Sequence, residues 1–573
     1  MPGILGDRPQ IWGMLAGEMW RKTRTAIRSG PLAKWRFTGL TPERILIAPP
    51  DLRIADPQIA IEFYNGRFPL GNTVVEATTQ SPFQVENANR AWLAALHNFR
   101  WLRHSRAADT ELTNANARSL VDDWLKLHGR KIQQPAWDPA TTAERVIAWL
   151  QHSPVVLQGA DFVFYRAFVK SLAVQVRYLR AIAPDVEQSD SRLRVRIALC
   201  FAALSLPNSG GVLRSASRHL ERELKAQILT DGGHVSRNPE VLLELLTDLL
   251  PLRQTYANQS ADMPAGLIQA IDRMFPALRG LRHRDGNLAL FNGSGATRSD
   301  RLAAVLRHDE SGSSPLLHGR YSGYQRLSMG HATVIADTGK PPRGRDSQAT
   351  NAGCLSFELS SGRHRYVVNA GIDTFGPEDY RLLARATAAH STATLNDTSS
   401  CRYSSKEWVK DWLGTTLVAG PRAVNVQRED TKTSQAFIAS HDGYVALFGL
   451  WHERSLSLSQ SGSQLEATDR FFRTGGAAPK NNGEDRVAVR FHLHPSIHPV
   501  RNGEGHLMLM ADNDDSWVFV CDEVEPVLEE SIFFAGVSGP QQTLQIVLAY
   551  KASEFPDIHW RFVRTGLGRW SNA

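Results

Sequence analysis

The stretch of sequence that decides the fold runs from Ile335 to Thr392. It contains IADTGKPP (residues 335–342), AGCLSFELSSGRHRYVVNAG (352–371) and RATAAHST (385–392). Apolar and polar residues alternate along these segments and glycine separates them, which is typical of short β-strands joined by turns. These segments also carry a small polar set, consisting of Asn351, Asn369, Arg385 and His390. The sequence therefore predicts paired strands that carry a group of polar side chains.

The strand period of two residues continues towards the C-terminus. Further strands are expected within residues 364–368, 443–450, 487–494, 517–520 and 544–549, and glycine, asparagine and aspartate punctuate them. Many short strands at regular intervals predict a large antiparallel β-sandwich.

Upstream of this region the hydrophobic period becomes helical. Apolar residues in the segment 92–102 recur at spacings of three and four, which places them on one helix face. Residues 241–252 form a dense apolar run, and we expect that helix to end near Pro251. Successive helices joined by short turns predict packed antiparallel pairs. The expected organisation is a helical domain over residues 1–297, a linker at 298–320 and a β-sandwich domain over 321–573.

Length and composition limit the classes of function. A chain of 573 residues is too long for one hydrophobic core, so two or more domains are expected. The net charge of +7 favours acidic partners such as a polysaccharide, a nucleic acid or anionic lipid. No compact basic run with interleaved aromatic residues is present, which disfavours nucleic acid. The four cysteines are scattered without zinc-site spacing, so we expect buried hydrophobic roles for Cys200, Cys354, Cys401 and Cys521.

The N-terminal segment is basic and carries tryptophan. Residues 1–36 contain seven Lys and Arg against two acids, together with Trp12, Trp20 and Trp35. One interpretation is a basic amphipathic helix that contacts a membrane surface. The other, which we favour, is a solvated helix packed on the first domain. A signal peptide of the usual form is not evident, and no stretch is long enough to span a bilayer.

Several segments, taken in their order, resemble the heparinase II/III family of polysaccharide lyases. They are FRWLRH (99–104), LTDGGHVSRNPE (229–240), AGCLSFELSSG (352–362), RATAAHST (385–392), GLWHERSLSLS (449–459) and RFHLHP (490–495). The resemblance implies an N-terminal incomplete α/α toroid followed by a large antiparallel β-sandwich. It also implies β-elimination of an acidic, uronate-containing glycan, and a place in the cell envelope or periplasm. Without an evident export signal, a cytoplasmic or membrane-peripheral location stays open.

Such an elimination needs three chemical groups. One group neutralises the uronate carboxylate, a base removes the proton on C5, and an acid protonates the departing O4. Aligned on the Asp-Gly-Gly turn, the Tyr-His pair that the family uses for proton transfer falls on Val241 and Leu242. Neither side chain transfers a proton. The remaining candidates nearby are His234 and Tyr256 for proton transfer and Asn238 for carboxylate neutralisation.

Arginines supply the candidate substrate-binding groups of the helical half, because a guanidinium can bind a carboxylate through two parallel hydrogen bonds. The candidates are Arg192, Arg194 and Arg237, and surface salt bridges are an equal alternative for the first two.

The β-half shows a similar departure from the family. Asn351 lies where the family has a His-x-His-x-Asp-like stretch, and Asn369 replaces an aspartate. His390 matches a family histidine, and Arg385 lies beside the same turn. Some members of the family hold zinc with His and Asp ligands from this domain. Two amides in place of stronger ligands weaken such a site, so no cofactor is expected and structural zinc at His390 and Asn369 is disfavoured.

Three functions fit these observations. The first is a lyase in which His234, Asn238, Tyr256, Arg385 and His390 carry the chemistry, with Asn351 and the arginines binding substrate. The alternative is a non-catalytic protein of the cell envelope that binds an acidic glycan. The third is a hydrolase that uses Asp231 and Glu240, although Asp231 is better suited to shaping a turn.

Overall fold

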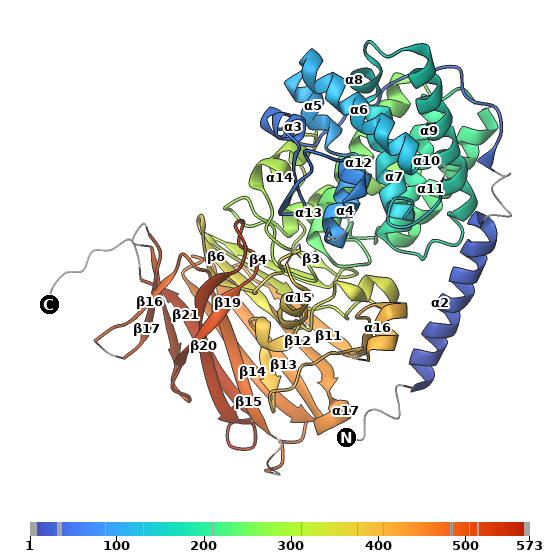
Figure 1. Cartoon of the computed structure of the whole chain (residues 1–573). Coiled ribbons are helices and arrows are strands. Elements are labelled where there is room, and N and C mark those ends of the chain that lie inside the picture. Colours follow the sequence, from blue (N-terminus) through green and yellow to red (C-terminus); the bar gives the residue numbers. More distant parts are fainter. Residues whose placement is uncertain are drawn as a thin grey trace. The chain divides into compact units, whose positions relative to one another are not determined.

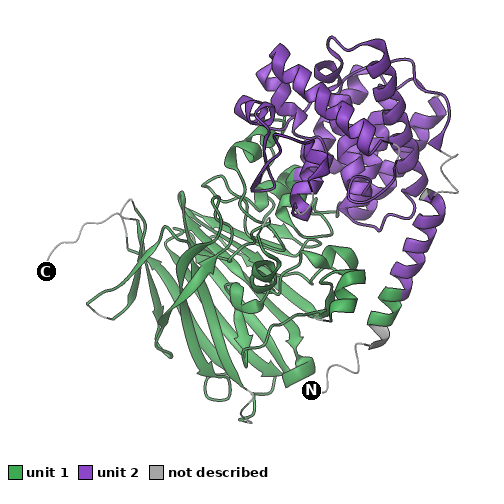
Figure 2. Cartoon of the chain, in the orientation of Figure 1, with its two compact units in different colours: residues 1–15, 229–243, 273–573 green, residues 16–228, 244–272 purple. Residues whose placement is uncertain are grey.

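The protein is described by a computed structural model that covers residues 8–30, 37–85, 88–129, 131–208, 210–310, 312–374, 376–404, 406–481, 483, 485–503, 505–512 and 515–565. The chain forms two compact units (Figure 2). Unit 1 comprises residues 1–15, 229–243 and 273–573, and unit 2 comprises residues 16–228 and 244–272. The units therefore do not divide the chain at residues 298–320. That segment contains helix α14 (Ser299–Leu306) and strand β3 (His318–Gly319), so it is structured rather than an open linker.

Unit 2 is built almost entirely of helices, coloured blue to green in Figure 1. Its elements are α3 (Pro57–Tyr64), β1 (Arg67–Leu70), β2 (Thr73–Glu76), η2 (Pro82–Gln84), α4 (Arg90–His97), α5 (Leu102–Ala108), α6 (Glu111–Leu127), α7 (Pro139–Gln151), α8 (Ser153–Leu157), α9 (Phe162–Ile182), α10 (Asp190–Ser205) and α11 (Gly210–Gln227). Helix α10 packs against α7, α9 and α11, and its residues 197–205 are all buried, so it lies in the core of this unit.

Three helices contribute residues to both units. They are α2 (Arg8–Ser29), α12 (Pro239–Asn258) and α13 (Ala265–Gly280). The N-terminal helix expected from the sequence is α2, although Trp35 lies outside the described residues. Its Arg28 pairs with Asp185 at 2.8 Å, in agreement with a helix packed on the helical domain. Contact with a membrane surface stays a prediction, and none of the described helices is long and apolar enough to cross a bilayer.

Two helix predictions were wrong in their boundaries. Residues 92–102 form α4 and α5 rather than one helix, because Phe99 adopts the left-handed conformation at φ +58°. Its ring is fully buried and stacks on Phe83, which stabilises this strained turn. Helix α12 continues through Pro251 to Asn258. A proline inside a helix costs about 3 kcal/mol. Burial of the neighbouring leucines, each worth about 1.5–3 kcal/mol, offsets that cost.

Unit 1 contains a sandwich of two antiparallel sheets. The first sheet has the strand order β11 (Val424–Asp430), β12 (Ser434–Tyr444), β13 (Leu450–Ser459), β14 (Gln464–Arg473), β21 (Asp557–Arg564), β18 (Ser516–Cys521), β17 (Leu507–Met510) and β16 (His498–Arg501). The second has the order β19 (Val527–Phe533), β20 (Gln541–Lys551), β15 (Arg486–Leu493), β7 (His364–Val368), β6 (Phe357–Ser361), β5 (Ala332–Asp337), β4 (Tyr324–Met329) and β3, and β8 (Ala393–Leu395) also pairs with β15.

Short elements connect these strands. They are η3 (Gly344–Gln348), α15 (Glu378–Ala384), η4 (Thr387–Ala389), α16 (Glu407–Leu413), α17 (Val445–Phe448) and a separate pair of strands, β9 (Arg402–Tyr403) and β10 (Leu417–Ala419). The strand expected over residues 443–450 is therefore interrupted by α17. Gly449 follows this helical turn at φ +70°, a conformation that glycine adopts without strain and that ends the turn before β13 begins.

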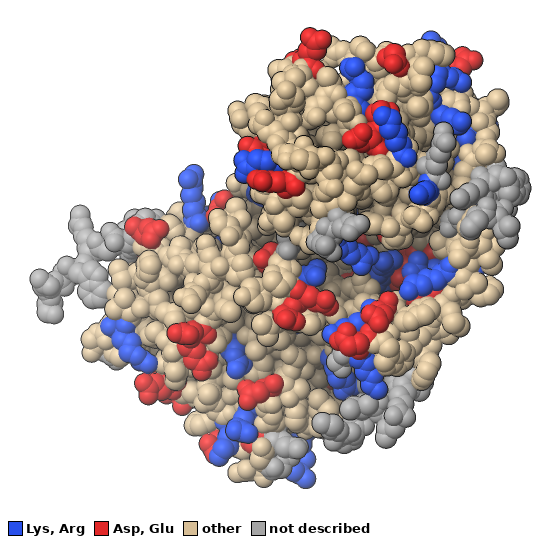
Figure 3. Space-filling model, in the orientation of Figure 1, with Lys and Arg blue, Asp and Glu red and all other residues tan. Residues whose placement is uncertain are grey.

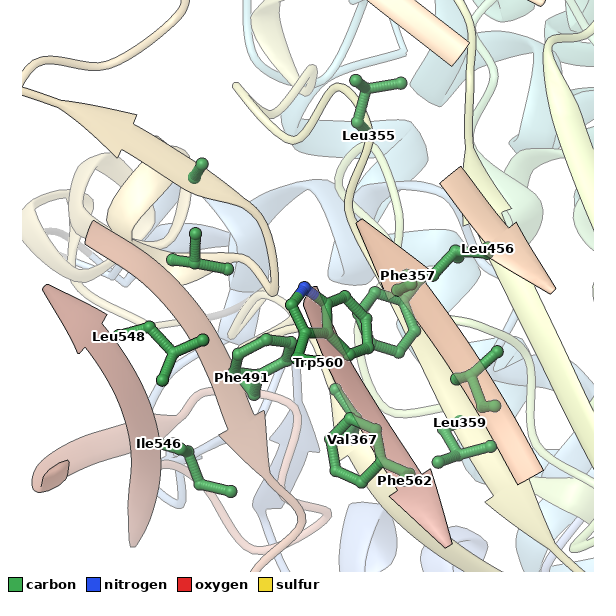
Figure 4. Close-up of a cluster of buried hydrophobic side chains, with 14 of the residues drawn as sticks. Leu355, Phe357, Leu359, Val367, Leu456, Phe491, Ile546, Leu548, Trp560 and Phe562 are labelled. Atoms are coloured by element: carbon green, nitrogen blue, oxygen red, sulfur yellow. The ribbon is translucent and has the colours of Figure 1, made fainter. Parts of the chain in front are cut away.

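The core of the sandwich lies between the two sheets. Trp560 of β21 stacks on Phe357 of β6 with ring centroids 5.5 Å apart, and Phe491 of β15 meets the same indole edge-on at 4.7 Å (Figure 4). Along β13, β14 and β15, buried residues alternate with less buried ones, as expected for strands with one face in a core. The apolar faces of both sheets thus close a single core, and the polar set lies at the ends of its strands.

Candidate functional site

The Asp-Gly-Gly turn belongs to unit 1 and is held by the carboxylate of Asp231. Oδ2 of Asp231 accepts hydrogen bonds from the backbone N–H of Tyr321 at 2.8 Å and of Ser322 at 2.7 Å. Gly232 has φ +85°, and a Cβ atom there would lie 1.8 Å from the carbonyl oxygen of Arg273. Asp231 therefore shapes this turn, as the sequence favours, and the hydrolase role suggested for it is not supported.

His234 and Asn238 follow the turn, and both side chains accept hydrogen bonds from nearby backbone N–H groups. Nδ1 of His234 accepts a hydrogen bond from the backbone N–H of Ser236 at 3.1 Å, so a neutral ring carries its proton on Nε2. Oδ1 of Asn238 accepts from the backbone N–H of Glu240 at 2.8 Å, which caps the start of α12. Both side chains are buried, at 2% and 8% exposure.

The space beside these two residues is small. A cavity of about 20 Å³ is lined by residues that include His234, Arg237, Asn238, Tyr324 and Arg326. A water molecule needs about 10–15 Å³ measured in this way. The cavity therefore accommodates about one water molecule and no sugar ring.

Arg237 connects the turn to the sandwich strands of unit 1. Its guanidinium forms an ion pair with Asp337 and donates from Nε to the carbonyl oxygen of Ser322 at 2.7 Å. Asn292 donates to the other oxygen of Asp337 at 3.0 Å and to the hydroxyl of Tyr324 at 2.8 Å. Arg237 is 7% exposed, so its guanidinium pairs with groups inside the fold and does not face a substrate.

Asn351 and His390 lie together at the end of the sandwich. Nδ2 of Asn351 donates to Nε2 of His390 at 2.8 Å, and Nδ1 of His390 donates to the carbonyl oxygen of Ala386 at 2.8 Å. Burial lowers the pKa of His390 to about 4, so the ring is neutral at neutral pH. Both ring nitrogens are engaged, and His390 is 1% exposed.

Arg385 lies beside this pair and binds backbone carbonyls. Its guanidinium donates to the carbonyl oxygens of Thr350 at 2.9 Å, Ser347 at 2.7 Å and Thr415 at 2.9 Å. It also lies over the ring of Tyr403, 3.8 Å from the ring centroid. Arg385 is 2% exposed, so it holds three chain segments together and does not face solvent.

Asn369 belongs to a second buried network, centred on Glu358. Oε1 of Glu358 accepts hydrogen bonds from the backbone N–H of Asn369 at 3.1 Å and of Leu290 at 3.0 Å. Its other oxygen pairs with Nε2 of His283 at 2.9 Å. Glu358 and His283 were missed from the sequence. The available signal was an acid inside the apolar strand FEL, because a buried carboxylate requires a partner.

These residues do not fit the zinc site that the family resemblance suggests. His390 uses both ring nitrogens in hydrogen bonds, and the amide of Asn369 is bound to Glu358 and to the backbone of Ser391. In the described part of the chain, no group of three or more His, Cys, Asp or Glu is arranged to hold a metal ion. Two further histidines of the sandwich are also engaged in hydrogen bonds rather than placed as metal ligands: His452 pairs with Asp469 at 2.7 Å and His492 with Ser531 at 2.8 Å.

The arginines of unit 2 are paired with acids. Arg192 pairs with Glu223 at 2.9 Å. Arg194 lies 3.7 Å from Asp248, and Arg53 and Arg100 bind the same carboxylate at 2.6 and 3.5 Å. Burial by itself raises the pKa of Asp248, but the three guanidinium charges lower it below its ordinary value. Glu144 and Glu244 also pair with these guanidinium groups at 3.2–3.8 Å, so the arginines are paired inside unit 2. Arg194 and Asp248 are buried, so this is not the surface salt bridging named as the alternative.

Tyr256 also belongs to unit 2 and is fully buried. Its hydroxyl lies 2.6 Å from Oγ of Ser217, and burial raises the pKa of Tyr256 above its ordinary range. A buried phenol with a raised pKa stays protonated at neutral pH, so it cannot accept the C5 proton. Leu242, at one of the two positions of the family's Tyr-His pair, is 1% exposed and packs as an apolar side chain.

The structure thus joins some of the predicted residues and leaves others apart. Asn351, His390 and Arg385 meet in unit 1, as do His234, Arg237 and Asn238, whereas Arg192, Arg194 and Tyr256 lie in unit 2. Figure 3 shows basic and acidic side chains interspersed over the face drawn, which agrees with a net charge of only +7 over the whole chain. Cys200, Cys354 and Cys401 are buried and free, as predicted, and Cys521 is half-buried.

Comparisons with known proteins agree with this fold. The family model for the heparinase II/III-like C-terminal domain matches residues 311–561. FtsZ-localized protein C of Caulobacter vibrioides is 30% identical over 537 residues, which cover 90% of this chain and 92% of that protein. Heparinase III superposes with a TM-score of 0.70 at 13% identity, covering 96% of this chain and 91% of the other.

A mutant of heparan sulfate lyase HepC from Pedobacter heparinus superposes with a TM-score of 0.63 at 15% identity, covering 99% of this chain and 92% of the other. At these identities the two lyases establish the fold alone. Both superpositions extend over the helical and the sandwich parts of the chain. The helical unit is therefore an incomplete α/α toroid, and the strands form a β-sandwich of the same fold. The chain belongs to the heparinase II/III-like family.

Proposed function

We propose that this protein binds an acidic glycan without cleaving it, and that it localises with FtsZ. The observation that carries the first part is the state of the proton-transfer candidates. His234 lies beside a cavity of about 20 Å³, Tyr256 is fully buried in unit 2, and Val241 and Leu242 stand at the two family positions.

The chemistry explains why this observation favours binding. A base must reach the C5 proton and an acid must reach O4, each within hydrogen-bond distance of the substrate. Nδ1 of His234 accepts a hydrogen bond from the backbone of Ser236, and the amide oxygen of Asn238 accepts one from the first turn of α12. Arg385 and Arg237 bind carbonyls and Asp337 rather than presenting a cation that would neutralise a uronate. Of the predicted groups, Nδ1 of His234, Oδ1 of Asn238 and the guanidinium groups of Arg237 and Arg385 are therefore engaged within the fold.

The acidic glycan is the ligand class suggested by the lyase fold and by the surplus of seven positive charges. Localisation with FtsZ rests on the 30% identical relative, whose name places that protein with FtsZ. This similarity extends over 90% of the chain, at twice the sequence identity of the lyase structures.

The first test measures binding and cleavage on the same samples. Purified protein is incubated with heparan-type, chondroitin-type and alginate-type polysaccharides while ultraviolet absorbance is followed, because elimination creates a C4=C5 double bond conjugated to the carboxylate. Binding to the same polymers is measured by calorimetry. We expect saturable binding to at least one polymer and no rise in absorbance. A rise in absorbance with the wild-type protein would overturn the proposal, and the His234→Gln protein then shows whether His234 takes part in the cleavage.

A lyase is the second candidate function, favoured by the lyase fold that extends over nearly the whole chain. On that alternative the absorbance rises in wild type, and a proton-transfer group outside the predicted set carries the reaction. The localisation part is tested separately by imaging a fluorescent fusion together with labelled FtsZ in the native host. A uniform distribution of the fusion would refute localisation with FtsZ and leave the binding proposal intact.

A further inference from the structure

A cavity of about 480 Å³ lies in unit 1, and its lining contains none of the site residues predicted from the sequence. It is lined by Met14, Pro341, Arg343, Gly344 and the segment 417–422. Sites for small ligands commonly have volumes of roughly 300–1,000 Å³. This cavity, unlike the space beside His234, has room for a sugar unit.

The charge of this cavity is uniformly positive. Arg343 and Arg422 are the charged residues of its lining, and both are exposed. Within the described part of the chain, neither guanidinium has an ion-pair or hydrogen-bond partner. The nearby carboxylate of Asp442 is engaged, because its Oδ1 accepts from the backbone N–H of Arg422 at 2.7 Å and of Ala423 at 3.0 Å. Two free guanidinium groups at one cavity favour a carboxylate or sulfate ligand.

Exposed tryptophans lie on two helices next to the cavity lining in the chain: Trp12 on α2, which supplies Met14, and Trp408 and Trp412 on α16, which precedes the segment 417–422. Trp12 is two residues from Met14 of the lining, is 62% exposed, and lies with its ring centroid 5.9 Å from that of Trp408. Trp408 and Trp412 are four residues apart on α16, so they share a helix face, and they are 46% and 43% exposed. Sugar rings present an apolar C–H face to indole rings, so exposed indoles on the helices that adjoin this lining in the chain favour an acidic sugar over a simple anion.

The walls of the cavity are held in place by buried hydrogen bonds. Oγ of Ser347 in η3 lies 2.9 Å from Oγ1 of Thr416 and accepts from the backbone N–H of Leu417 at 3.0 Å. Arg385 ties the same two segments together by donating to the carbonyl oxygens of Ser347 and Thr415. Arg385 is thus a positioning residue for this cavity, and the walls are ordered before any ligand arrives, which lowers the entropic cost of binding.

We infer that this cavity, with Arg343, Arg422 and the tryptophans Trp12, Trp408 and Trp412, is a binding site for an acidic oligosaccharide. The inference rests on the proposed glycan binding and assigns it a location on the sandwich unit. The guanidinium groups bind carboxylate or sulfate groups of the sugar, and the indole rings pack against its apolar faces.

The experiment uses the full chain and titrates heparan-type and alginate-type hexasaccharides by calorimetry. The variant Arg343→Gln with Arg422→Gln is expected to weaken binding by roughly tenfold or more and to reduce its salt dependence, because two charge-assisted contacts are removed. The matched control, Arg363→Gln with Arg486→Gln, removes two exposed charges of the same unit whose side chains have no partner among the described residues, and it is expected to bind like wild type. Trp408→Ala is expected to weaken binding without changing the salt dependence.

Each other outcome overturns the inference in a distinguishable way. Equal binding by wild type and the Arg343/Arg422 variant would move the glycan site elsewhere and leave the proposed function standing. No binding of wild type to either hexasaccharide would overturn both. Binding to phosphatidylglycerol vesicles that the Arg343/Arg422 variant loses, without oligosaccharide binding, would assign this face to a membrane surface instead.

Discussion

The side-chain amide of Asn351 donates a hydrogen bond to Nε2 of His390, with the two nitrogens 2.8 Å apart. The bond occupies the ring nitrogen that would otherwise be free to accept a proton or bind a metal ion. The opposite nitrogen is fixed by the carbonyl oxygen of Ala386. His390, the best match to a family site residue in the sandwich, is therefore a neutral, buried packing residue.

The burial of His390 predicts a loss of stability in acid. Its pKa is about 4 in the folded protein and near 6.5 when unfolded, so between these values the unfolded chain binds the extra proton. Its contribution is present in full above pH 6.5 and declines as pH falls towards 4, by about 3 kcal/mol. Urea denaturation at a series of pH values measures the decline. His390→Gln is expected to have a shallower dependence, with His498→Gln at an exposed position as the control.

A wild-type pH dependence as shallow as that of His390→Gln would contradict this prediction. Two other histidines act in the same direction, since desolvation also lowers the pKa of the buried His492 and of the half-buried His494 to about 3. The comparison between variants therefore isolates His390, whereas the total slope reports all of them.

Removal of metal is expected to leave stability unchanged. The nitrogens of His390 and the amide of Asn369 are already hydrogen-bonded, so their geometry requires no ion. Differential scanning calorimetry before and after dialysis against a chelator is the measurement. A lower melting temperature that added zinc restores would show that this fold contains a metal site after all.

Arg237 and Asp337 are expected to be a strong stability determinant of unit 1. Arg237→Ala leaves the carboxylate of Asp337 buried without its cation, and breaking a buried pair in this way costs about 3–5 kcal/mol. Chemical denaturation followed by circular dichroism measures the loss. The exposed Arg363→Ala is the control, and an equally small effect of both substitutions would mean that water reaches Asp337.

Tyr256 is expected to contribute to stability rather than to chemistry. Tyr256→Phe removes the hydrogen bond to Ser217 and is expected to cost about 1 kcal/mol, because Oγ of Ser217 loses its buried partner. Ser217→Ala and the double variant complete a cycle that isolates the pair. Glycan binding should be unchanged in all three. If elimination is detected in wild type and Tyr256→Phe abolishes it, the phenol is catalytic.

The fold could be predicted largely from local patterns. Strands β6 and β7 form within the quoted stretch, where apolar and polar residues alternate and a glycine turn separates the two strands. The errors occurred where tertiary packing overrides local preference. Pro251 stays inside α12 because its neighbours are buried leucines, and Phe99 breaks a helix because its ring stacks on Phe83. Neither stabilising contact is visible from the spacing of residues.

The site was predicted less well, for the same reason. The sequence identified Asn351, Arg385 and His390 as a group, and the structure brings them together. It did not identify Glu358 with His283, because these residues are 75 positions apart and only the packed sandwich pairs them. It also did not identify the cavity at Arg343 and Arg422, which forms only when the segments 341–344 and 417–422 meet.

The sequence by itself determined the order of a helical half and a β-sandwich half, and the family. These properties depend on residue type and periodicity, which are local. Tertiary structure alone decided which polar side chains form hydrogen bonds and ion pairs within the fold and which remain available to a ligand. The engagement of His234, Arg237 and Arg385 and the freedom of Arg343 and Arg422 depend on partners distant in the chain, because burial and hydrogen bonding are set by packing in three dimensions.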